Sequence, residues 1–111
     1  MRRAVTNLID NAIKFTKSTI NITAKRNNLY LIIEVTDNGI GIEADNLSQI
    51  FNRMYQTEQS RNKKSNHGIG LVLYFVDKVV HLHHGTITAK SELGVFTTFS
   101  ITLPLSEALI E

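Results

Sequence analysis

The sequence predicts an α/β two-layer sandwich, in which a mixed, mostly antiparallel sheet carries helices on one face. Three observations support this fold class. The 111 residues are enough for one domain, and 42% of them are apolar, as in ordinary globular proteins. Apolar residues recur at helical spacing in some segments and alternate with polar residues in others. The segments follow the order helix, two strands, helix, long loop, helix, two strands, which suits helices packed on one sheet face.

The first half of the chain provides a helix and a hairpin. Residues 2–16 have the spacing of an amphipathic helix. Its buried stripe is expected to contain Val5, Leu8, Ile9, Ala12 and Phe15. Residues 18–26 and 29–37 alternate and are rich in β-branched residues, and the Asn27-Asn28 pair between them indicates a turn.

The second half repeats this pattern after a polar loop. Residues 43–55 predict a short helix with an irregular continuation, and the polar residues 56–67 predict a loop. A helix is expected from Gly70 to about His83, with Gly85 as its stop. Residues 86–90 and 96–103 predict strands around a turn at residues 92–94.

Composition excludes several classes of protein. A net charge of +2 is too small to indicate a broad nucleic-acid-binding surface. The absence of cysteine excludes disulfide scaffolds and thiolate metal sites, and it fits a reducing compartment. The longest apolar run, residues 69–76, is far shorter than the ~20 residues of a membrane-spanning helix. We therefore expect a cytoplasmic domain without membrane contact by this segment, whether or not a parent protein is membrane-anchored.

A polar stripe lies on the first predicted helix. At about 100° per residue, Asn7, Asn11 and Lys14 fall within roughly 60° of arc. An asparagine inside a helix lowers helix stability by up to ~0.7 kcal/mol relative to alanine, so helix propensity does not explain this pattern. It is either a solvated face or a wall that holds a charged ligand.

Two glycine segments suggest ligand contacts. A strand ends at Asp37, Gly39 and Gly41. The carboxylate could bind an exocyclic amine, and the glycines could let a flat ligand approach the backbone. The alternative is an ordinary turn. Gly68 and Gly70 open the later helix, whose free N–H groups suit an anion. The basic loop at residues 61–64 precedes this helix and could reinforce an anion site. The alternative is that its charged side chains are simply solvated. Each signal is weak alone, but their joint order is improbable by chance.

Five segments together carry a resemblance to a known family. These are NLIDNAIKFT at 7–16, DNGIGI at 37–42, IFNRMYQ at 50–56, HGIGL at 67–71 and the closing stretch 81–104. They resemble the N box, first glycine box, F box, second glycine box and final helix and hairpin of the catalytic ATP-binding domain of sensor histidine kinases. The wider class includes gyrase, heat-shock chaperone ATPases and mismatch-repair ATPases. The similarity covers almost the whole of residues 1–111, read as one domain.

The resemblance implies a site for ATP and Mg²⁺. Asn11 is the expected metal ligand with Asn7 beside it, and Lys14 is expected to neutralise phosphate charge. Asp37 would hold the adenine amine, and residues 56–67 would be the ATP lid. The full expected nucleotide-binding set is Asn7, Asn11, Lys14, Phe15, Asp37, Gly39, Gly41, Ile42, Phe51, Tyr55, Arg61, Gly68, Ile69, Gly70, Leu71 and Thr98.

The resemblance also implies the reaction. Hydrolytic relatives, and the serine-kinase relatives, carry glutamate where this chain has Asn7, and an amide cannot act as a general base. This favours ATP-dependent transfer of the γ-phosphate to a histidine on a dimerisation domain, followed by relay to a response regulator. The neighbours of His81, His83 and His84 do not match the acid-flanked acceptor, so no catalytic residue is assigned.

Some features depart from the family pattern. Asn66-His67 stands where a glycine is usual, Phe96 replaces another glycine, and Gln56 replaces an arginine. The first strand region and the dimerisation domain are also absent, so the fragment is expected to be incomplete for autophosphorylation and open to self-association. The alternative function is a nucleotide-binding regulatory module without kinase turnover. Nucleic-acid binding through residues 61–64 is a weaker alternative.

Overall fold

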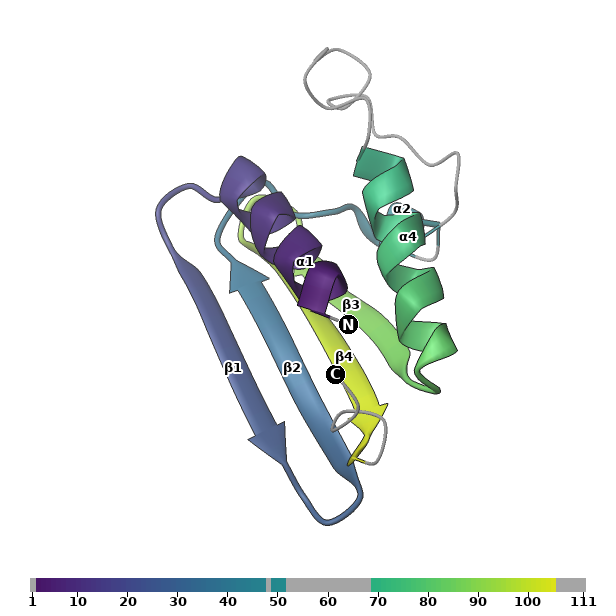
Figure 1. The fold of residues 1–111 in the computed structure, drawn as a ribbon. Helices are drawn as coiled ribbons and strands as arrows, with labels where there is room; N and C mark the ends of the chain where they lie inside the picture. Colours follow the sequence, from purple (N-terminus) through teal and green to yellow (C-terminus); the bar gives the residue numbers. More distant parts are fainter. Residues whose placement is uncertain (1, 48, 52–68, 106–111) are drawn as a thin grey trace.

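The computed structural model describes residues 2–47, 49–51 and 69–105 (Figure 1). Its elements follow the predicted order. They are α1 (Arg2–Phe15), β1 (Ile20–Arg26), β2 (Tyr30–Asp37), α2 (Ala44–Leu47), α4 (Ile69–Leu82), β3 (Thr86–Glu92) and β4 (Phe96–Pro104).

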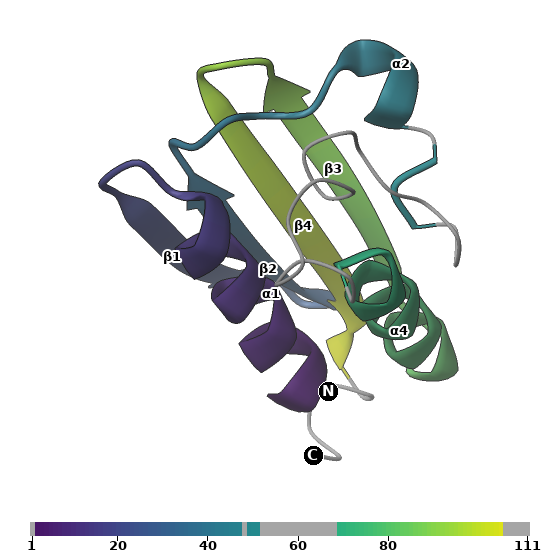
Figure 2. The ribbon, with the colours of Figure 1, turned by 90° about the horizontal axis from the view of Figure 1, so that it is seen from above.

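The strands form one sheet in the order β1-β2-β4-β3. Both predicted hairpins, β1–β2 and β3–β4, are confirmed, and β2 pairs with β4 at the centre. Every pairing among the described strands is antiparallel, so the mixed character that we expected is not present in this part of the chain. Helices α1 and α4 both lie against the same face of the sheet, as expected (Figures 1 and 2).

The core lies between these helices and the two central strands. Along β4, every second residue from Thr97 to Leu103 is buried, so this strand turns one side to the helices and the other away. The core includes Leu8 and Ala12 of α1, and Val76 and Val80 of α4. Strand β1 is exposed over most of its length because it forms the edge of the described sheet.

The short helix with an irregular continuation that we expected at residues 43–55 is confirmed for the described residues. Helix α2 has four residues, Ala44–Leu47, and the described continuation is a turn at residues 49–51. The expected loop at 56–67 lies outside the described residues. Among the described helices, none is long and apolar enough to span a membrane.

Helix α4 ends in a Schellman motif. The Gly85 N–H donates to the Val80 carbonyl at 3.0 Å, and the His84 N–H donates to the His81 carbonyl at 3.0 Å. This arrangement requires a left-handed residue, and His84 occupies it with a φ of 62°. The expected helix stop is therefore confirmed, but the strained position belongs to His84 rather than to Gly85.

Replacing His84 with glycine is expected to stabilise the protein by about 0.5–1 kcal/mol, because glycine adopts a positive φ without steric cost. Urea unfolding measures the change. His84→Ala is the control, since it removes the imidazole but keeps a Cβ at the strained position. Equal gains in both variants would show that the ring, and not the backbone, causes the effect.

Candidate functional site

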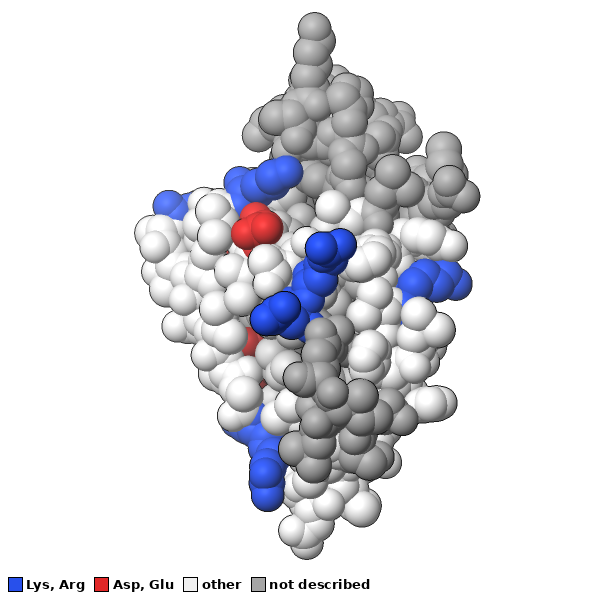
Figure 3. Space-filling model, in the orientation of Figure 1, with Lys and Arg blue, Asp and Glu red and all other residues white. Residues whose placement is uncertain are grey.

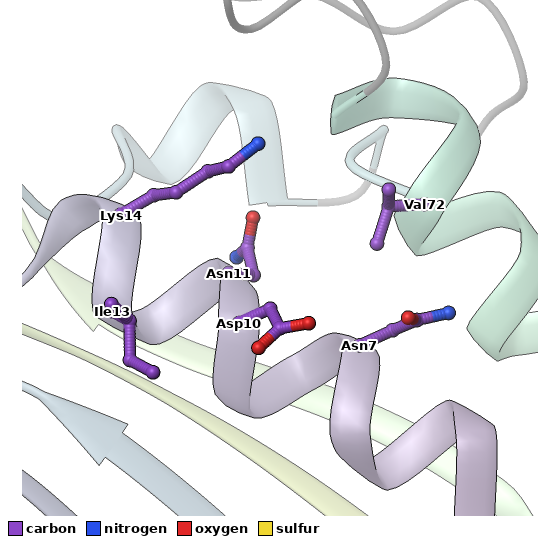
Figure 4. Close-up of a pocket in the computed structure, with 6 residues that line it drawn as sticks. All are labelled: Asn7, Asp10, Asn11, Ile13, Lys14 and Val72. Atoms are coloured by element: carbon purple, nitrogen blue, oxygen red, sulfur yellow. The ribbon is translucent and has the colours of Figure 1, made fainter.

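The polar stripe of α1 lines a cavity of about 370 Å³ (Figure 4). Val72 of α4 faces it from the opposite side (Figure 4). The lining residues are Asn7, Asp10, Asn11, Ile13, Lys14 and Val72. The structure thus places the three residues of the predicted stripe around one hollow, together with Asp10, which the sequence analysis did not select.

Asn11 is the most informative residue of this cavity. It is only 9% exposed, although its neighbour Lys14 is exposed. Among the described residues, none forms a hydrogen bond with the side-chain amide of Asn11. Buried polar groups normally have a partner, so an amide of this kind fits a site that is completed by a ligand. Its carbonyl oxygen is a hard donor of the type that Mg²⁺ favours.

Asp37 is the second buried polar residue among those predicted for the site, although it does not line the cavity. It is 4% exposed, and its Oδ1 accepts a hydrogen bond from the Gly39 N–H at 2.8 Å. Burial raises the pKa of the Asp37 carboxyl, and the hydrogen bond from Gly39 partly opposes this rise. The other oxygen, Oδ2, has no hydrogen-bond partner among the described residues and remains available as an acceptor.

The turn after Asp37 is packed tightly between two neighbouring segments. A Cβ at Gly39 would lie 1.9 Å from the Phe15 carbonyl oxygen at the end of α1. Gly41 has a φ of +72°, and a Cβ there would lie 2.4 Å from the Glu92 carbonyl oxygen. The two glycines therefore let the turn approach other backbone closely, and Gly39 places this turn beside the C-terminal end of α1.

Asn38 fixes the loop that follows α1 to this turn. Its Oδ1 accepts hydrogen bonds from the N–H groups of Lys17, Ser18 and Thr19 at 3.0–3.2 Å, and from the Thr16 hydroxyl at 3.0 Å. The sequence analysis missed this role. The signal was weak, because an asparagine after a strand is also an ordinary turn residue.

Thr98 does not lie where the sequence analysis expected it. Its hydroxyl contacts the Thr36 hydroxyl at 2.8 Å, on the sheet face that points away from the helices. Thr97 is 5% exposed and pairs with Asp37 across the ladder, so it shares the face of Asp37. We therefore move the expected role at the adenine end from Thr98 to Thr97; the alternation of residues 96–103 could have revealed this.

Three other expected site residues are half-buried and do not line the cavity. Phe15 lies at the end of α1, beside Gly39. Ile42 packs against the core, and its N–H donates to the Ser91 hydroxyl at 2.7 Å. The Phe51 ring meets the Phe99 ring edge to face, with centroids 6.2 Å apart, so Phe51 anchors the chain to the core.

The remaining expectations concern the lid and the second glycine box. Tyr55, Arg61, Gly68 and the lid at 56–67 lie outside the described residues. Ile69, Gly70 and Leu71 form the first turn of α4, as the helix-opening pattern predicted. Within the described ranges, no group of three histidine or carboxylate side chains is arranged to hold a metal ion.

The chain matches known proteins along nearly its whole length. The family of histidine kinase-, DNA gyrase B- and HSP90-like ATPases matches residues 1–107. The sensor protein SrrB of Staphylococcus aureus is 40% identical over 109 residues, which are 96% of this chain and 18% of that protein. The chain therefore spans about a fifth of the length of this curated relative.

Solved structures of histidine kinases share the fold. Full-length ShkA, crystallised in complex with AMPPNP, matches with a TM-score of 0.79 and 28% identity over 93% of this chain and 21% of ShkA. The mycobacterial sensor histidine kinase MprB matches with a TM-score of 0.79 and 27% identity, over 92% of this chain and 70% of the MprB chain.

Proposed function

Because this chain belongs to the family of histidine kinase-, DNA gyrase B- and HSP90-like ATPases, we propose that it binds ATP with Mg²⁺ and donates the γ-phosphate to a histidine. The acceptor would lie on the dimerisation domain of a sensor histidine kinase, and an aspartate of a response regulator would receive the phosphoryl group next. The observation that carries this proposal is the buried, unpartnered amide of Asn11 beside the Lys14 ammonium.

The residues of the cavity fit a magnesium ion and a polyphosphate. Asn11 and Asn7 would offer side-chain oxygens to the ion, and Lys14 would offset phosphate charge. When bound, the ion supplies positive charge shared between the phosphate oxygens. Asn7 and Asn11 are amides, which cannot act as a general base, so they would act through positioning, and Lys14 would act through charge neutralisation.

The Asp37 end fits the adenine base. The Oδ2 atom of Asp37 can accept a hydrogen bond from the exocyclic amine, while the Gly39 N–H holds the other carboxylate oxygen in place. Thr97 is buried on the same face. Since ATP is the donor, we assign this domain to the cytoplasmic side of its parent protein.

The phosphotransfer prediction is tested with radiolabelled ATP and the dimerisation domain of the same parent kinase. Wild-type protein is expected to label the acceptor histidine. Asn11→Ala should lower the rate by about 100-fold or more, because it removes a positioned electrostatic contact. Asn21→Ala, an exposed asparagine on the edge strand β1, is the matched control and should label normally.

Two results would count against the proposal. Unchanged labelling by Asn11→Ala would remove Asn11 from the site. Binding of ATP by the wild-type protein without any transfer would favour the alternative, a regulatory module that binds nucleotide without turnover.

A further inference from the structure

The side chain of Asp10 lines the same cavity as Asn7, Asn11 and Lys14. On a helix with about 100° per residue, Asp10 and Asn11 lie at opposite edges of an arc of roughly 100°, with Asn7 and Lys14 between them. Asn11 is buried at the inner edge and Asp10 is exposed at the outer edge. Figure 4 shows the Asp10 carboxylate directed toward the hollow between α1 and α4.

Asp10 has no evident structural role in helix α1. It is not in the first turn, where a carboxylate would interact favourably with the helix dipole. Lys14 lies four residues later, at the spacing of a helix ion pair, but the structure forms no ion pair between them. Among the described residues, no group donates a hydrogen bond to the Asp10 carboxylate.

A free carboxylate at a polyphosphate site has a specific electrostatic consequence. It repels bare phosphate oxygens, and it attracts a divalent cation that lies between it and the phosphates. The carboxylate is exposed, so solvent weakens both effects without removing them. Lys14 acts in the opposite sense, because its ammonium attracts phosphate whether or not a cation is present.

We propose that Asp10 is the residue that makes nucleotide binding at this cavity depend on a divalent cation. The inference rests on the proposed nucleotide-binding function and adds a coupling between the two ligands. Asp10 disfavours nucleotide without Mg²⁺ and favours the Mg²⁺ complex. The reciprocal effect follows by linkage, so bound nucleotide must also strengthen Mg²⁺ binding through this residue.

The test measures the affinity for AMPPNP by calorimetry, once with Mg²⁺ and once with EDTA. In EDTA, Asp10→Asn is expected to bind AMPPNP about fivefold more tightly than the wild type does. The factor by which Mg²⁺ raises the affinity for AMPPNP is expected to be smaller in Asp10→Asn, by at least the same fivefold. Glu34→Gln is the matched control. It removes the same charge on the opposite face of the sheet, where Glu34 accepts a hydrogen bond from the Ser100 hydroxyl at 2.9 Å, and it should leave both affinities unchanged.

The possible outcomes separate this inference from the function on which it rests. If the wild-type protein binds AMPPNP, and Mg²⁺ raises the affinity by the same factor in the wild type and in Asp10→Asn, the role of Asp10 is overturned and the proposed function is left intact. An equal change in Glu34→Gln also overturns it, because net charge would then be the cause. Absence of AMPPNP binding by the folded wild-type protein overturns both proposals.

Discussion

Replacing Gly39 with alanine is expected to destabilise the protein by about 3 kcal/mol or more and to abolish nucleotide binding. The new Cβ would lie 1.9 Å from the Phe15 carbonyl oxygen and 2.8 Å from the Asp37 Oδ1. The first atom belongs to backbone at the end of α1, so relief of the clash requires a helix or a turn to move. Urea unfolding and AMPPNP calorimetry measure the two effects.

A matched glycine separates this clash from ordinary backbone strain. Gly94 has a φ of +80°, and a Cβ at this position meets nothing within 4 Å. Gly94→Ala should therefore cost only about 1 kcal/mol, from its positive φ, and should keep nucleotide affinity. If Gly39→Ala were no more destabilising than Gly94→Ala, the close approach of the turn to α1 would be wrong.

The overall fold could be predicted because its local signals agree with its packing. The alternating pattern predicted β2 and β4, which are the central strands, and the helical spacing predicted α1 and α4, which cover them. Both hairpins followed from turn residues between alternating segments. The α2 region was predicted as a short helix with an irregular continuation, which the described residues confirm, but a short polar segment without strong periodicity leaves the exact ends of the helix undetermined.

The candidate site was predicted in part, for reasons that differ between residues. Asn7, Asn11 and Lys14 share one helix face, so their spacing alone placed them together. Asp10 was missed because a lone carboxylate on a helix resembles a solvated surface residue.

The other misses depend on tertiary pairing. Thr97 and Thr98 differ only in the sheet face that they occupy, and a one-residue shift reverses that face. The role of Asn38 depends on a loop about twenty residues earlier in the chain, which local patterns do not reveal.

Replacing Asp37 with asparagine is expected to separate stability from function. The affinity for ATP should fall roughly 10- to 100-fold, because the charged acceptor that we propose for the adenine amine is lost. The free protein should become more stable, by about 1 kcal/mol, because a buried charge is removed while an Oδ1 atom remains for the Gly39 N–H. Calorimetry with ATP and urea unfolding without ligand measure the two changes.

The stability gain should depend on pH in a defined direction. The folded-state pKa of Asp37 is raised above its ordinary value of 3.8, so the folded protein holds this proton more tightly than the unfolded chain does. Wild-type stability from this group is therefore present below pH 3.8 and is lost as the pH rises through the raised pKa. The advantage of Asp37→Asn should be small at low pH and reach its full size above the folded pKa.

An exposed carboxylate gives the control for this titration. Asp45 lies at the surface in the first turn of α2, so Asp45→Asn changes the same functional group without removing a buried charge. It should produce no stability gain near neutral pH and no loss of ATP affinity. A pH-independent advantage of Asp37→Asn would show that burial of the charge is not its cause. Unaltered ATP affinity in Asp37→Asn would remove this carboxylate from the adenine end of the site.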